Sequence, residues 1–121
     1  MGRTKGFNQE EVINIIGEVF IKKGFNGTSL DDIVKGTGVL RGSLYSAFGS
    51  KLGMFTAALT ASLSNYSKQK NLELVLIAML EVAPNNREVR IILNRWYEAN
   101  NQTDIAEKIG LALLKRSGIG E

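Results

Sequence analysis

The stretch of residues 28–51 constrains the fold of this chain more than any other part of it. It holds two short segments whose apolar residues recur at helical spacing, separated by Gly36 and Gly38 and followed by a boundary at Gly49 and Ser50. Glycine tolerates the left-handed backbone of a tight turn, and two helices that cross steeply need such a turn. The sequence therefore predicts a short helix, a glycine turn, a second short helix and the capped start of a third.

The two short helices are expected to differ in what they expose. In the first, Ser29 is the expected N-cap, Asp32 has the spacing of a capping box, and Asp31 also lies in the first turn, where the helix dipole favours acids. The second is expected from about Leu40 to Ala47. It should bury Val39, Leu44 and Phe48 and turn outward the side chains of Arg41, Ser43, Tyr45 and Ser46.

The remaining segments are also predicted to be helical, because strand-like alternation is absent and proline occurs once, at Pro84. The expected helices begin after N-caps, stop at glycine or before proline, and run from Asn8 to Gly24, from Ser50 to about residue 67, over 72–82, and from Asn85 onward with a pattern that resumes at Ile105. A mobile arm that carries Arg3 and Lys5 is expected before the first helix.

These segments predict an all-α fold in two parts. Residues 1–49 are expected to form a three-helix helix-turn-helix domain, and residues 50–121 a linking helix with a short helical dimerisation or regulatory region.

Charge and composition favour a nucleic-acid partner over catalysis. The net charge is +3, but residues 1–70 hold nine Lys or Arg against five acids, so the basic excess lies in the half that contains the helix-turn-helix. The chain has no Cys and no His, which removes thiolate chemistry, the commonest general base and the commonest metal ligand. We expect no enzyme, no metal and no cofactor. The longest apolar run, Val75 to Leu80, is too short for a membrane span, and a cytoplasmic protein is expected.

The chemistry of the second short helix suits DNA. Arg41 can bind guanine in a bidentate manner or bind a phosphate, and Gly42 lets the backbone approach closely. Ser43 and Tyr45 can donate hydroxyl hydrogen bonds to phosphate oxygens. Lys51, at the start of the next helix, would add its charge to free backbone N–H groups that face a phosphate.

From about Gln9 to Phe55 the sequence resembles the DNA-binding domain of the tetracycline-repressor (TetR/AcrR) family of bacterial transcriptional regulators. The resemblance rests on four blocks that occur in order, at residues 20–25, 28–33, 38–45 and 48–51, together with Phe55. It implies an all-helical homodimer that binds a palindromic operator. Most members repress transcription and release DNA when a small molecule enters the C-terminal domain.

The resemblance also assigns separate roles to individual residues. Thr28 and Ser29 would contact phosphate, and Tyr45, Ser46 and Lys51 would hold the DNA backbone. The base edges would be met by Leu40, Arg41, Gly42 and Ser43. Leu40 stands where small polar residues are frequent in the family, so its contact is expected to be apolar, for instance with a thymine methyl group.

The C-terminal region departs from the family pattern in length, with about 55 residues after Ser67. The resemblance implies that helices of the ligand-binding domain are missing, so the presence of an inducer pocket and of a small-molecule inducer stays open. Dimerisation is still expected through an apolar set, although the helix over 72–82 is an alternative cover for it within one chain. The set consists of Ile92, Trp96, Tyr97, Ile105, Ile109 and Leu113.

Two further interpretations remain open at this point. A shortened regulator would act by pairing with a longer relative, or it would repress constitutively without an inducer. Whether the C-terminal region associates with its own copy distinguishes the first of these from a homodimer.

Overall fold

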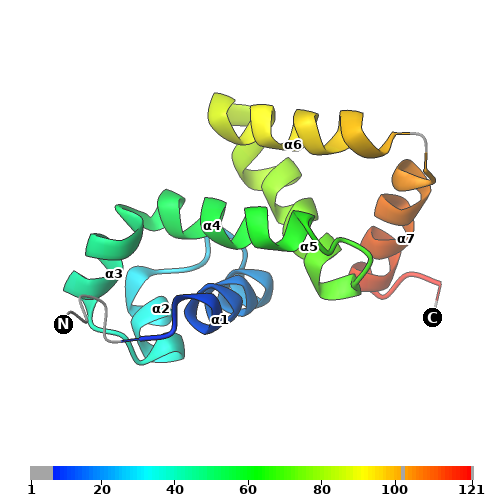
Figure 1. Ribbon diagram of the computed structural model, residues 1–121. Coiled ribbons are helices and arrows are strands. Elements are labelled where there is room, and N and C mark those ends of the chain that lie inside the picture. Colours follow the sequence, from blue (N-terminus) through cyan, green and yellow to red (C-terminus); the bar gives the residue numbers. More distant parts are fainter. Residues whose placement is uncertain (1–6, 102, 121) are drawn as a thin grey trace. The chain divides into compact units, whose positions relative to one another are not determined.

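A computed structural model describes residues 7–101 and 103–120 of the chain, and all regular structure in these residues is helical (Figure 1). The predicted arm with Arg3 and Lys5 lies outside the described residues. The all-α prediction is confirmed. The chain divides into two compact units, Met1–Ala61 and Ser62–Glu121, so the division falls near the end of a helix rather than at its start. The functional division at residue 49 stays a prediction.

The first unit contains the N-terminal helices, α1 (Gln9–Lys23), α2 (Leu30–Thr37), α3 (Arg41–Phe48) and most of α4 (Lys51–Leu63). The caps lie where the sequence predicts them. The Oδ1 atom of Asn8 accepts a hydrogen bond from the Glu11 N–H at 3.0 Å, and the Ser50 Oγ accepts one from the Gly53 N–H at 2.9 Å. Helix α4 ends four residues before the predicted position, and residues 64–67 form a turn.

The core of the first unit is built around three aromatic rings. Phe20 and Phe55 are fully buried, their rings meet edge to face with centroids 5.1 Å apart, and Phe25 contacts both. Ile33 from α2 and Leu44 from α3 are also fully buried. Each of the two short helices is therefore anchored by one central apolar side chain, which leaves its outer face free of core packing.

The turn between α2 and α3 depends on Gly38, which has φ 71° and ψ 11° and donates its N–H to the Val34 carbonyl at 2.8 Å. Gly36 was expected to break α2, and this is wrong, because it lies inside the helix. A Cβ atom at Gly36 would lie 2.8 Å from Cγ2 of Val19, so glycine here allows α1 and α2 to pack closely.

The second unit contains α5 (Gln69–Ile77), a π-helical segment η1 (Ala78–Val82), a 3₁₀ turn η2 (Ala83–Asn85), α6 (Arg87–Asn100) and α7 (Ile105–Ser117). The predicted stop before Pro84 is in fact a change of helix type. The N-cap of the next helix is Asn86, whose Oδ1 accepts the Val89 N–H at 2.9 Å, and not Asn85. Fully buried side chains of this core include Leu74, Val75 and Val89.

Candidate nucleic-acid interface

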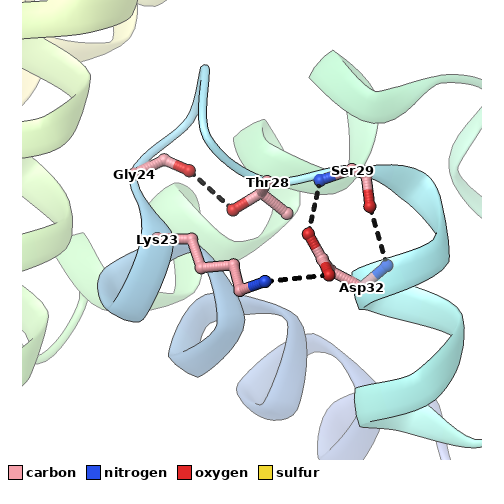
Figure 2. A network of polar contacts seen from close by, with 5 residues as sticks. All are labelled: Lys23, Gly24, Thr28, Ser29 and Asp32. Carbon is pink, nitrogen blue, oxygen red and sulfur yellow. Dashed lines mark hydrogen bonds and ion pairs between the residues drawn. The ribbon is translucent and has the colours of Figure 1, made fainter.

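The start of α2 is held by a network of polar contacts that also reaches the end of α1 (Figure 2). The Ser29 Oγ accepts the Asp32 N–H at 3.0 Å, and the Asp32 carboxylate accepts the Ser29 N–H at 2.8 Å, which completes the predicted capping box. The other carboxylate oxygen of Asp32 accepts a hydrogen bond from the ammonium group of Lys23, with an N–O distance of 3.0 Å. This carboxylate therefore ties the last turn of α1 to the first turn of α2.

The contacts of Asp32 have a consequence for stability. The Ser29 backbone and side-chain hydrogen bonds and the Lys23 ammonium hold the pKa of Asp32 below its usual value of 3.8, at about 2. A carboxyl whose pKa is lower in the folded state stabilises that state above its unfolded pKa, and this stabilisation disappears as pH falls through the folded pKa.

We therefore expect the stability advantage of the native protein over the Asp32→Asn variant to disappear between about pH 4 and pH 2. Urea unfolding of both proteins followed by circular dichroism across that range measures it. A constant difference between the two proteins at every pH would contradict the assignment.

Thr28 and Ser29, both expected to contact phosphate, are placed differently. Thr28 is 2% exposed, and its hydroxyl donates to the Gly24 carbonyl at 2.6 Å, so its side chain closes the turn after α1 (Figure 2). Ser29 is exposed, and its hydroxyl can still donate a hydrogen bond while it accepts the Asp32 N–H. Of the pair, only Ser29 presents a side chain to solvent.

The outer face of α3 carries most of the residues expected to meet DNA. Leu40, the N-cap residue, is 76% exposed, which is the largest value among the exposed large apolar side chains, and Tyr45 is 46% exposed. Arg41, Gly42 and Ser46 are exposed, and Ser43 is half-buried. A Cβ atom at Gly42 would meet no protein atom within 4 Å, so the fold itself does not require glycine there.

Arg41 does not point freely into solvent, because its Nη2 atom forms an ion pair with the Asp31 carboxylate of α2. Sequence reasoning missed this contact and gave Asp31 only a role at the helix dipole. Ten residues and a turn separate the two, so no periodic pattern within one helix points to their pairing.

Lys51 is placed at the start of α4, as expected, and its Nζ lies 4.4 Å from the centroid of the Phe25 ring. This cation–π contact holds the ammonium close to the aromatic cluster. Part of the helix N-terminus is already satisfied by the Ser50 hydroxyl. Lys51 is half-buried, so its charge lies close to the body of the first unit.

The residues expected to form a dimer interface do not share one exposed surface. Trp96 and Ile105 are buried in the single chain, and the Trp96 ring packs edge to face on Tyr66. Ile92 and Ile109 are half-buried. Tyr97 and Leu113 are exposed, together with apolar residues that were not predicted, namely Ile91, Leu111, Leu114 and Ile119.

Within residues 7–101 and 103–120 no cluster of acidic side chains is arranged to hold a metal ion. None of the helices in this described part is both long enough and apolar enough to cross a membrane.

Comparison with known proteins gives matches that each cover part of the chain. Residues 17–58 match the family model for bacterial regulatory proteins of the tetR family. The chain is 40% identical over 63 residues to YezE, an uncharacterized HTH-type transcriptional regulator of Bacillus subtilis, with 52% of this chain and 32% of YezE covered. It is 38% identical over 58 residues to the HTH-type transcriptional repressor BdcR of Escherichia coli, covering 48% of this chain and 29% of BdcR.

A third relative, the HTH-type transcriptional repressor ComR of Escherichia coli, is 30% identical over 73 residues, covering 60% of this chain and 35% of ComR. The chain thus spans about a third of the length of these relatives. The expectation that the protein is not an enzyme agrees with the matches, since all of them are named as regulators. The matched segment includes all of α2 and α3 with their glycine turn, so the helix-turn-helix part of the chain is similar to the tetR family of bacterial regulatory proteins.

Proposed function

We propose that the protein is a sequence-specific DNA-binding transcriptional regulator whose helix α3 enters the major groove. The observation that carries the proposal is the division of α3 into two faces. Leu44 is fully buried and fixes the helix, whereas Leu40, Arg41 and Tyr45 are exposed on it. A recognition helix needs this combination, because the N-terminal residues of that helix contact base edges while its packing sets its angle.

In the proposed complex the exposed residues have separate roles. Arg41 reads a base, Leu40 offers an apolar contact to a thymine methyl group, and the open Gly42 admits the DNA surface. Ser29, Ser43, Tyr45, Ser46 and Lys51 hold phosphates and fix the register. Thr28 acts indirectly, since its buried hydroxyl closes the turn that leads into α2.

We further propose that the protein binds a palindromic operator as a homodimer and represses transcription in the bacterial cytoplasm. Two of the relatives are named as repressors, which supports repression. The exposed apolar side chains on α7, Leu111, Leu113 and Leu114, offer surface to a second copy. A monomer would contact few phosphates, and a two-fold dimer doubles them. Control by a small-molecule inducer stays outside the proposal.

A nuclease footprint on the DNA that flanks the gene of this protein tests the proposal. We expect a protected palindrome with two equivalent halves. The logarithm of the binding constant should fall with the logarithm of the salt concentration, with a slope of about 0.9 for each phosphate contacted. A fragment of equal length from within the coding region serves as the control. If no palindrome is protected even at low salt, binding of a homodimer to an operator beside its own gene is excluded.

The same experiment addresses the alternative in which this chain acts by pairing with a longer relative. The exposed apolar residues of α7 fit that partner as well as a second copy. In that case the protein alone protects nothing, and protection by the longer relative changes when this chain is added.

A further inference from the structure

We propose that Asp31 is a specificity-determining residue that holds Arg41 for base reading and discourages its binding to phosphate. The inference rests on the proposed function, because it concerns how the DNA-binding face of α3 chooses between sequences. It is carried by the ion pair between Nη2 of Arg41 and the Asp31 carboxylate, which joins the two helices of the helix-turn-helix motif.

Asp31 is not needed for the start of α2. The neighbouring Asp32 completes the capping box with Ser29 and accepts the Lys23 ammonium (Figure 2). Asp31 instead extends its carboxylate, 70% exposed, toward Arg41. The two adjacent acids therefore have different partners, and that of Asp31 lies on the face proposed to bind DNA.

Arg41 is the first residue of α3, where the positive end of the helix dipole disfavours a cation, and the first turn of α3 contains no acid. The Asp31 carboxylate supplies the missing negative charge from α2. The two side chains are 54% and 70% exposed, and an ion pair between such side chains adds little to the stability of a fold. Because the pair lies on the face proposed to bind DNA, we infer that its main effect is on how Arg41 binds DNA.

The geometry of the guanidinium explains how the ion pair with Asp31 affects whether Arg41 binds guanine or phosphate. Arginine has five N–H donors in a planar fork, and the ion pair engages one nitrogen, so other donors are available for guanine O6 and N7. A guanine edge is neutral, whereas a phosphate that approached Arg41 would also approach the Asp31 carboxylate. Asp31 therefore lowers the affinity of Arg41 for phosphate more than its affinity for guanine.

The test compares the native protein with Asp31→Asn on two duplexes. One carries the sequence that the native protein itself enriches from a random duplex library, and the other is a scrambled duplex of the same composition. We expect Asp31→Asn to bind the scrambled duplex more tightly, so that the ratio of the two affinities falls by about threefold to fivefold, the range that an exposed ion pair permits. On the scrambled duplex, the slope of the logarithm of the binding constant against that of the salt concentration should steepen by about 0.9 for each Arg41 that forms a new phosphate contact.

Two controls separate positioning from a simple change of net charge. Glu10→Gln removes the same charge from the first turn of α1 and should leave the affinity ratio unchanged. In an Arg41→Ala background, Asp31→Asn should no longer change the ratio, although it still raises affinity for both duplexes by removing a negative charge.

The possible failures are distinguishable. If the native protein enriches no sequence, both the proposed function and this inference are excluded. The native protein could instead enrich a sequence while Asp31→Asn keeps the native affinity ratio, or lowers that ratio by the same factor when Arg41 is already alanine. Either result excludes the role of Asp31 and leaves the proposed function standing. Unchanged thermal unfolding of Asp31→Asn would show that the effect on binding is not a loss of fold.

Discussion

Replacing Arg41 with alanine is expected to change which DNA sequence the protein prefers, with a loss of about 1–3 kcal/mol of discrimination at one base pair of each half-site. The reason is geometric. Arg41 is the first residue of α3, its side chain is exposed, and Asp31 holds its guanidinium at the end of the helix that we propose to enter the groove. Enrichment of binding sequences from a random duplex library, for the native protein and the variant, measures the change directly.

Tyr45→Ala is the matched control on the same helix. Its hydroxyl is expected to contact the DNA backbone, so the variant should weaken binding to all duplexes nearly equally and leave the preferred sequence intact. If Arg41→Ala behaved in this way and Tyr45→Ala changed the preference, the roles of the two residues would be reversed. If neither altered the preference, α3 would not be the recognition helix.

Local chemistry allowed the first unit to be predicted closely from the sequence. The starts of α1, α2 and α4 are predictable because Asn8, Ser29 and Ser50 each accept a hydrogen bond from the backbone N–H three residues later. The turn at Gly38 is predictable because glycine tolerates the left-handed backbone that the structure shows there. Each of these signals is contained within a few residues, so no knowledge of the tertiary structure is needed.

The sequence failed where contacts join separate segments. Gly36 looks like a helix breaker, but its role is set by Val19 on another helix. The pairing of Asp31 with Arg41 crosses a turn. In the second unit, Trp96 was assigned to a dimer surface because an apolar stripe does not show which neighbour covers it, and in the structure it packs on Tyr66. The π-helical segment before Pro84 likewise has no local signal that we recognised.

The largest effect on stability is expected from Phe20→Ala, at about 3–5 kcal/mol of the free energy of unfolding. Phe20 is fully buried, and its ring contacts both Phe25 and Phe55, so truncation leaves a cavity at the point where α1, α4 and the segment after α1 meet. A small domain has only about 5–15 kcal/mol of stability in total, so the first unit should be partly or wholly unfolded. Urea unfolding followed by circular dichroism measures the loss.

Leu40→Ala is the matched control for this prediction, because it also truncates a large apolar side chain in the first unit. Leu40 is exposed, so its truncation should change stability by no more than about 0.5 kcal/mol. Trp96, the one tryptophan of the chain, lies in the second unit, and its fluorescence follows that unit separately. We expect Phe20→Ala to lose DNA binding together with helicity, and Leu40→Ala to keep its helicity and change only its binding preference. Equal losses of helicity in both variants would show that the aromatic cluster does not hold the first unit together.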